Sequence, residues 1–390
     1  MTIAPKVFKS KPRKRKIIAN GCATAADMIG PIEYGCEIFG LTGGQYSFID
    51  ILEHCLNNIG PAHCMIATWT ASYASIEKAK RFCGDSRLLS CTWMVDNSFV
   101  TRKPELCKQL VSRFGYDCIR TCPSHAKFLL LWNDDWNIVI RTSMNLNQNK
   151  RVESFEISDD AELMNHMRES CARIGGSVGI VQKRKKRKTE EEYSTNASQI
   201  IGSIDSGCEI VGLTDGEFSF VDIIEHCLDE IGGADCIVST WTASQAHLDR
   251  IKVLKESESL RSCRWIIDRS FRAQKPKRCN GMLAEFGKDS VRTASTHSKF
   301  ALLWNDTRAI VIRTSMNLNH NPRCEDFEIS DDKALLGYMR GLCETVFKAE
   351  GENNAFTTKN ETEKITSHFK TGDLWEGKLS LNTAPLSLNV

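Results

Sequence analysis

Apolar and polar positions along the chain follow two different periods. Apolar residues recur at every third or fourth position in three segments, which predicts amphipathic helices over 47–59, 71–82 and 105–114. Short runs rich in β-branched and aromatic residues predict strands over 64–69, 91–96, 126–132 and 137–144. The last two strands are separated by the turn-prone sequence NDD, so they form a hairpin. Strands that alternate with helices of this length predict an α/β fold with a mixed sheet.

This pattern is written twice. GCEIFGLTGG at 35–44 returns as GCEIVGLTDG at 207–216, and TWTAS at 68–72 returns at 240–244. The longest match, SHAKFLLLWNDDWNIVIRTSMNLNQN from residue 124, returns as THSKFALLWNDTRAIVIRTSMNLNHN 172 residues later. The offset is constant, and roughly half of the positions from 35 to 154 are identical without a gap, far above chance for so long a period. The chain therefore contains a duplicated domain rather than a solenoid of short repeats.

Basic tracts mark the limits of the two copies. KPRKRK at 11–16 and KRKKRK at 183–188 lie at the same offset. After about residue 348 the repeat stops and the sequence becomes polar, which is typical of a mobile tail. We therefore predict a basic N-terminal arm, a first domain, a charged linker, a second domain and a tail, over 1–20, 21–180, 181–194, 195–348 and 349–390.

The composition of the chain says more about where in the cell the protein is expected than about what it does. The 390 residues suffice for two domains with separate cores, and 51 basic against 49 acidic residues leave a net charge of +2, so a polyanion partner would have to be bound by local clusters. No apolar run approaches the roughly 20 residues that span a bilayer. With no apolar leader and no C-x-x-C zinc pairs, we expect a soluble, cytoplasmic protein without a membrane partner.

The 17 cysteines fit that compartment as small buried side chains rather than as disulfides. Twelve of them form six pairs at the offset of the repeat, mostly within apolar patterns: Cys36/Cys208, Cys55/Cys227, Cys64/Cys236, Cys91/Cys263, Cys107/Cys279 and Cys171/Cys343. Metal and redox chemistry are the alternative roles for these thiols.

The duplicated hairpin carries the candidate chemistry. His125 and Lys127 stand two apart in its first strand, so both side chains leave the same face of the sheet. Ser143 and Asn145 repeat that spacing in the second strand. Imidazole, ammonium, hydroxyl and amide groups together suit a phosphate, because Lys neutralises it, Ser and Asn donate to its oxygens, and His attacks or protonates. The second copy supplies the equivalent residues His297, Lys299, Ser315 and Asn317.

This arrangement resembles the phospholipase D superfamily, whose signature is H-x-K-x4-D followed by G-S-x-N. The resemblance covers residues from about 35 to 345. It implies two tandem phospholipase D-like α/β sandwich domains with mixed sheets, which form a pseudo-dimer within one chain, monomeric as a whole. It also implies that the two motif copies face each other across a pseudo-twofold axis and build one active site.

The resemblance implies a mechanism as well. One motif histidine attacks phosphorus to form a phosphohistidine, and the other protonates the leaving oxygen and then activates water. No metal and no cofactor are expected. The sequence leaves open which of His125 and His297 is the nucleophile. An acidic residue after the second motif orients a motif histidine, and Glu156 and Glu328 are assigned to that role, with Glu153 and Glu325 as the nearer alternatives.

Two positions depart from the signature. Its Asp falls at Trp132 and Trp304, and the nearest acids are Asp134 and Asp306, two residues later. Its Gly is replaced by Thr142 and Thr314. Phosphodiesterases that repair protein-DNA adducts also lack the Asp. The expected catalytic groups are His125, Lys127, Asn145, Glu156, His297, Lys299, Asn317 and Glu328, and the expected phosphate contacts are Arg141, Ser143, Arg313 and Ser315.

Basic tracts beside such a site indicate a polyanionic substrate. We expect contact between a nucleic-acid backbone and Lys183, Arg184, Lys185, Lys186, Arg187 and Lys188. The leading hypothesis is a metal-independent phosphodiesterase, an endonuclease that acts on nucleic acid, with DNA expected in preference to RNA. The alternatives are a non-catalytic nucleic-acid-binding protein with the same fold, and a phospholipase or transphosphatidylase.

Three further pairs of polar residues recur at the same offset. His54 and His226 lie on an amphipathic helix without a second ligand at metal spacing, so a structural role is expected. Asp96 and Asp268 end matching strands, where they either cap a loop or line the site. The simplest role of Ser72 and Ser244 is to cap the helix that follows each of them.

Overall fold

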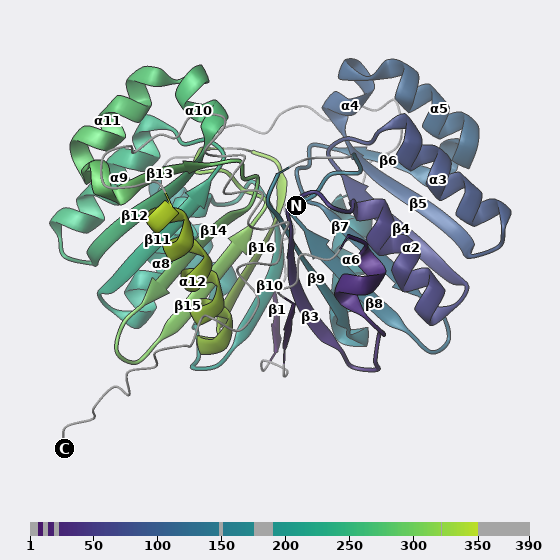
Figure 1. Ribbon diagram of the computed structural model, residues 1–390, viewed down its shortest axis with the longest axis horizontal. Coiled ribbons are helices and arrows are strands. Elements are labelled where there is room, and N and C mark those ends of the chain that lie inside the picture. Colours follow the sequence, from purple (N-terminus) through teal and green to yellow (C-terminus); the bar gives the residue numbers. More distant parts are fainter. Residues whose placement is uncertain are drawn as a thin grey trace.

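The computed structural model describes residues 7–10, 15–18, 23–147, 151–174, 190–320 and 322–349. These residues fold into two halves, each built on an eight-stranded mixed sheet. Figure 1 shows the halves side by side, the first in purple to blue and the second in teal to yellow, with most helices on the outer sides of the two sheets. The α/β class predicted from the sequence is confirmed.

In the first half, helices follow strands in the order that the apolar pattern predicts. Its elements are β2 (Lys16–Ile18), α1 (Ala25–Ile29), β3 (Glu37–Thr42), α2 (Phe48–Ile59), β4 (Ala62–Thr68), α3 (Tyr73–Gly84), β5 (Leu88–Asp96), α4 (Asn97–Arg102), α5 (Pro104–Phe114), the 3-10 helix η1 (Tyr116–Cys118), β6 (Ile119–Cys122), β7 (Phe128–Trp132), β8 (Asn137–Thr142), β9 (Glu153–Asp159) and α6 (Ala161–Ile174).

The second half repeats that order. Its elements are α7 (Glu190–Ile201), β10 (Glu209–Asp215), α8 (Phe220–Ile231), β11 (Ala234–Thr240), α9 (Gln245–Glu256), β12 (Leu260–Asp268), α10 (Arg269–Gln274), α11 (Pro276–Phe286), η2 (Lys288–Ser290), β13 (Val291–Ala294), β14 (Lys299–Trp304), β15 (Ala309–Thr314), β16 (Cys324–Asp331) and α12 (Lys333–Ala349). The remaining strand, β1 (Val7–Ser10), belongs to the N-terminal segment.

Both sheets have the same strand order. The orders are β2-β3-β9-β8-β7-β4-β5-β6 and β1-β10-β16-β15-β14-β11-β12-β13. The strands β4, β5 and β6 run parallel because a helix connects each to the next, whereas β7, β8 and β9 are antiparallel. The start of β7 and the end of β8 therefore lie at the same edge of the sheet, and β14 and β15 repeat this arrangement.

The N-terminal segment joins the edges of both sheets. Strand β1 pairs antiparallel with β10 of the second half, and Val7 lies opposite Gly212. Strand β2 pairs parallel with β3 of the first half, and Lys16 lies opposite Ile38. We expected a basic arm over residues 1–20, and the described part of this segment pairs main-chain groups that would otherwise be exposed at two sheet edges.

Other predicted segments fall partly or wholly outside the described residues. Helix α7 begins at Glu190, inside the expected linker 181–194. The basic residues 183–188 lie outside the described residues, as does the tail after Ala349.

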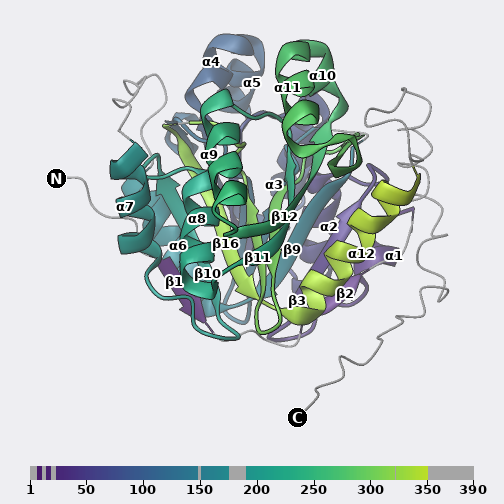
Figure 2. The same cartoon turned by 90° about the vertical axis from the view of Figure 1, so that its left-hand side faces the viewer.

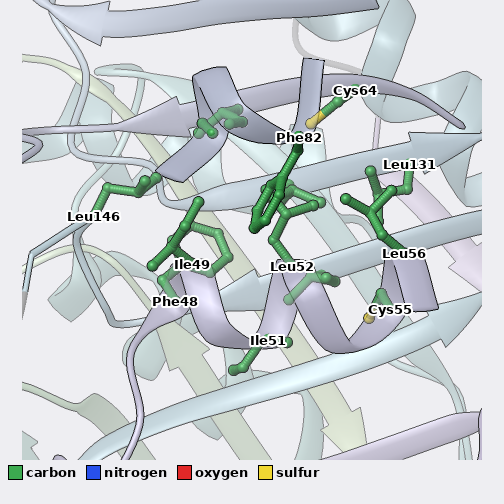
Figure 3. Close-up of a cluster of buried hydrophobic side chains, with 14 of the residues drawn as sticks. Phe48, Ile49, Ile51, Leu52, Cys55, Leu56, Cys64, Phe82, Leu131 and Leu146 are labelled. Carbon is green, nitrogen blue, oxygen red and sulfur yellow. The ribbon is translucent and has the colours of Figure 1, made fainter. Parts of the chain in front are cut away.

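Helix α2 shows how the apolar pattern builds the outer core. Its buried side chains recur at helical spacing: Phe48, Ile51, Leu52, Cys55, Leu56 and Ile59. Ser47 and Asp50 form a capping box at its start, and Gly60, with φ of 78°, ends it. Figure 3 shows this face packed with Cys64, Phe82 and Leu131. Each large apolar side chain buried in this way contributes about 1.5–3 kcal/mol.

The inner faces of the sheets form cores that both halves share. Helix α6 of the first half packs with Val211 and Leu213 of β10. Helix α12 of the second half packs with Phe39 of β3, and Figure 2 shows it near that strand. Because each C-terminal helix contacts a strand of the other half, the halves are held in a fixed relation, which brings together the loops at their facing edges.

Several expectations about single residues are confirmed. His54 Nε2 lies 2.7 Å from Gly30 O, and His226 repeats the contact with Gly202 O at 2.8 Å, so both histidines are structural. Ser72 and Ser244 accept from backbone N–H groups at the starts of α3 and α9. Ten of the twelve recurring cysteines are buried, and Cys36 and Cys208 are half-buried. No described helix combines the length and apolar character needed to cross a membrane.

Candidate active site

All motif residues except Lys299 lie in loops at the strand ends, and Lys299 is the first residue of β14. His125 and Lys127 precede β7, which begins at Phe128, and Ser143 and Asn145 follow β8. The sequence pattern placed the histidine and lysine within one strand, and this was wrong because the strand starts later. In the second half His297 precedes β14 in the same way.

Backbone hydrogen bonds fix each histidine loop to the other half. His125 N donates to Cys324 O at 2.9 Å, and His297 N donates to Val152 O at 3.2 Å. The return bonds run from Cys324 N to Pro123 O and from Val152 N to Ser295 O, at 2.7 and 3.0 Å. The two loops are therefore held against each other across the pseudo-twofold axis.

Each histidine ring is paired with a glutamate of the opposite half. His125 Nδ1 lies 3.0 Å from Glu325 Oε1. His297 Nδ1 lies 3.6 Å from Glu153 Oε2 and 3.2 Å from Ser143 O. These are the acids that the sequence offered as nearer alternatives. The geometry makes one composite site, since neither half contains both a motif histidine and its acid.

Serine hydroxyls hold those two carboxylates. Ser143 Oγ donates to Glu153 and accepts from Ser154 N at 2.9 Å. In the second half Ser315 Oγ donates to Glu325, 2.5 Å away. We assigned these serines to direct phosphate contact, but the structure engages their hydroxyls with the glutamates that orient the histidines.

Both glutamates remain ionised despite their burial. Burial alone would raise the pKa of Glu153, but the neighbouring His297 and the Ser143 hydroxyl lower the pKa below its ordinary value. Burial likewise opposes ionisation of Glu325, and His125 and Ser315 lower its pKa below the ordinary value. Each histidine therefore faces a carboxylate, which fixes the orientation of the ring.

The two motif lysines supply positive charge to the same site. Lys127 Nζ donates to His125 O and Lys299 Nζ donates to His297 O, each at 2.6 Å. Burial and the neighbouring Lys127 lower the pKa of Lys299 to about 7. Burial and Lys299 also lower the pKa of His297. An anion bound between the lysines would relieve their mutual repulsion, as expected of a phosphate site.

The motif asparagines add buried amide groups whose oxygen atoms accept no hydrogen bond from the described residues. Asn145 and Asn317 are 8% and 7% exposed, and their Oδ1 atoms are buried without a hydrogen-bond partner among the described residues. A buried polar atom left unpaired is costly in a folded protein and is common where a ligand binds. The unpaired atom is an acceptor, so it can contact only a donor group of a substrate, and donation from the amide nitrogens to a phosphate stays a prediction.

Four predicted site residues lie elsewhere. Glu156 and Glu328 face Arg141 and Arg313 across paired strands, and they contact these arginines rather than the motif histidines. In these ion pairs Arg141 is buried and Arg313 is half-buried. The assignment of the glutamates to histidine orientation and of the arginines to phosphate contact is therefore corrected.

Those four residues belong to a buried charge network between the halves. Its other members are Arg15, Glu37 and Glu209. Burial, together with Glu156, raises the pKa of Glu37 to about 7, and burial, Glu328 and Glu156 raise that of Glu209 to about 8. Although the carboxylates of Glu37, Glu156 and Glu209 lie close enough together to suggest a metal site, they already contact Arg15 and Arg141.

Three site residues were missed from the sequence. Arg323 Nη1 lies 2.6 Å from His125 Nε2. Trp69 and Trp241 flank the two histidines, with ring centroids 5.7 Å from His125 and 6.2 Å from His297. The duplication could have identified these residues, because both tryptophans stand in the repeated sequence TWTAS and Arg323 has an equivalent in Arg151.

The strand-end aspartates combine the two roles left open above. Asp96 caps α4 by accepting from Ser98 N at 2.9 Å, and Asp268 caps α10 in the same way. Asp96 Oδ2 also accepts from Ser124 N and lies 3.5 Å from Arg323 Nη1. At least in the first half, the capping residue therefore also lines the site.

The lowered pKa of Lys299 predicts that anion binding takes up a proton. Below about pH 7 Lys299 is charged in the empty site, and above it the charge is lost, so tungstate, a phosphate analogue, should bind more weakly by up to roughly tenfold per pH unit. Calorimetry at pH 8 in buffers of different ionisation enthalpy should reveal the proton uptake. Lys299→Arg should abolish most of it, because a guanidinium stays charged. Equal uptake in both proteins would contradict this assignment.

No protein-family model and no curated protein matches the chain. Among solved structures, phosphatidylserine synthase from Haemophilus influenzae Rd KW20 is similar in fold, with a TM-score of 0.54, 12% identity, and coverage of 85% of this chain and 91% of that chain. Polyphosphate kinase from Porphyromonas gingivalis gives a TM-score of 0.51 at 12% identity, over 87% of this chain and 55% of that chain.

Both similar structures have the phospholipase D-like fold. The fold class expected from the sequence is therefore confirmed: the chain consists of two tandem phospholipase D-like α/β domains. Within that class it is a two-copy form with His-x-Lys and Ser-x-Asn in each half. At 12% identity the similarity concerns the fold alone.

Proposed function

We propose that the protein is a metal-independent phosphodiesterase that cleaves nucleic acid at one site shared by its two halves. The observation that carries the proposal is the exchange of acids across the axis, in which Glu325 pairs with His125 and Glu153 with His297. Two oriented imidazoles beside two lysines supply a nucleophile, a proton donor and phosphate charge neutralisation. The reaction needs no cation to generate hydroxide, because a histidine attacks first.

Aromatic groups at the site support nucleic acid as the substrate. Trp69 and Trp241 are half-buried beside the two histidines, so a planar group could stack on either side of the scissile phosphate. The Arg102 guanidinium lies 3.9 Å from the Trp69 ring centroid, which adds positive charge at that position. Aromatic platforms with cations are the usual means of binding single-stranded nucleic acid.

The lipid alternative has weaker support. The apolar cavity beside Lys299, lined by Leu41 and Met339, holds about 60 Å³, which is room for a few water molecules. An acyl chain would need far more space. The small volume of this cavity therefore weighs against a phospholipid as the substrate.

The decisive experiment is a substrate panel in EDTA. Purified protein is incubated with labelled single-stranded DNA, duplex DNA, RNA and phosphatidylcholine vesicles, with His297→Ala as the matched control. Cleavage of DNA in chelator that is absent from the control is the expected result. Product from phosphatidylcholine alone would identify a lipid enzyme, and retention of DNA without product would identify a binding protein.

Variants of the tryptophans test the nucleic-acid part separately. Trp69→Leu and Trp241→Leu should each weaken binding of single-stranded DNA about tenfold or more, since stacking of one base contributes roughly 1–3 kcal/mol. Turnover of a small dialkyl phosphodiester should change less than about twofold. Trp132→Leu is the control, because Trp132 carries a stacked Arg168 at the opposite end of β7. Unchanged DNA affinity in both site variants would exclude the stacking role.

A further inference from the structure

The two motif histidines are not equivalent in their contacts. Arg323 Nη1 lies 2.6 Å from His125 Nε2 and 3.5 Å from Asp96 Oδ2. A guanidinium only donates, so Nε2 of His125 must accept and carries no proton while the bond is made. The ring proton then resides on Nδ1, which faces Glu325. The atom of His125 that would meet a substrate is thus occupied by an arginine.

His297 presents the opposite situation. Its Nδ1 faces a carbonyl oxygen, that of Ser143, and therefore must carry the ring proton. Burial and Lys299 lower the pKa of this ring, which favours its neutral form. Among the described residues, the polar contacts of the ring are made by Nδ1. The lone pair on Nε2 is therefore available for attack.

We propose that Arg323 binds the substrate phosphate, and that its contact with His125 assigns the attack on phosphorus to His297. The proposal rests on the proposed phosphodiester cleavage and names the groups that perform it. The negative phosphate draws the guanidinium away from His125, so that binding of the substrate exposes Nε2 of that ring.

In this assignment His297 forms and breaks the bond to phosphorus, and His125 carries the protons. Once released, Nε2 of His125 takes a proton from solvent, and Glu325 offsets the charge of the imidazolium. His297 Nε2 then forms a bond to phosphorus while the bond to the leaving oxygen breaks, and that oxygen takes the proton from His125. In the second step His125 removes a proton from water, the water oxygen bonds to phosphorus, and the bond to His297 breaks.

The repeat offers a matched control in Arg151. It stands 172 residues before Arg323, at the equivalent place in the first half, and it is half-buried. It makes no contact with His297 in the described part of the chain. If position in the repeat alone determined function, both arginines would behave alike, whereas the geometry predicts that only Arg323 acts on a histidine.

Tungstate affinity tests the phosphate-binding role without relying on turnover. Calorimetry in EDTA should show Arg323→Gln binding at least about tenfold more weakly than wild type, Arg323→Lys between the two, and Arg151→Gln within about twofold of wild type. Thermal melting of each variant checks that the fold is intact. Wild-type affinity in Arg323→Gln, or an equal loss in Arg151→Gln, would overturn this role.

The position of the covalent phosphoryl group tests the nucleophile. With a p-nitrophenyl phosphodiester, whose leaving group needs no proton, quenched samples should carry the label on His297 by mass spectrometry. His125→Ala should still be labelled and His297→Ala should not. A label on His125 would overturn the assignment while the proposed function stands. A protein that takes no label and turns over no substrate would overturn both, and the role of Arg323 in anion binding would still be decided by the tungstate series.

Discussion

Replacing either His125 or His297 by alanine is expected to reduce nucleic-acid cleavage by roughly three orders of magnitude or more. Each ring is oriented by a glutamate of the other half, so each half contributes a part that the other cannot replace. The double variant should be little worse than either single variant, because groups that act as a unit are not additive. Steady-state kinetics on labelled DNA in EDTA would measure all three.

A control histidine makes this comparison specific. His63 is half-buried on β4, where its Nδ1 contacts Ser90 Oγ at 2.8 Å, and His63→Ala should keep near wild-type turnover. Two independent sites would give a different pattern, with about half the activity left in each single variant and none in the double variant. That outcome would refute the shared site.

The second large effect concerns stability. Glu156 is fully buried and contacts both Arg141 and Arg313, and these cations lower its pKa although burial opposes ionisation. Glu156→Gln would remove the carboxylate that Arg141 and Arg313 share and leave Glu328 as their common counter-charge, so the free energy of unfolding should fall by roughly 3–5 kcal/mol. Chemical denaturation at pH 6, followed by far-UV circular dichroism, measures the loss.

Glu209→Gln is the matched variant in the same network. Because the pKa of Glu209 is raised to about 8, this carboxyl is mostly protonated at pH 6, and a neutral amide should cost less than about 1 kcal/mol there. A raised pKa in the folded state gives stability that is present at low pH and is lost as the pH rises through about 8. Between pH 6 and 8.5 Glu209→Gln should therefore lose less stability than wild type. Equal losses in both glutamine variants at pH 6 would contradict this description.

From the sequence we could predict the helices and strands and the division into two halves, because these follow from local pattern and from the repeat. Periodicity predicted helices such as α2 and α5, and the constant offset predicted two matching halves with a histidine and a lysine in each. Those features depend on residues close together in the chain or on their duplication. The meeting of the two motifs followed from the family resemblance.

What the sequence could not predict depends on contacts across the axis. Glu153 and Glu156 are both duplicated and stand three apart, so they point to opposite faces of one strand. Only the placement of the other half decides that Glu153 meets His297, and that Glu156 meets Arg313 in addition to Arg141 of its own half. Arg15 is a similar case. It stands in a basic tract typical of solvated charge, yet it is buried because carboxylates from both halves converge on it.

The most direct test of the shared site is the stoichiometry of tungstate binding. Calorimetric titration of the wild-type chain at pH 6.5 in EDTA should give one bound anion per chain, and Lys127→Gln and Lys299→Gln should each weaken that same binding event about tenfold or more. Two anions per chain, each weakened by only one of the two substitutions, would contradict the account, because each half would then contain its own site.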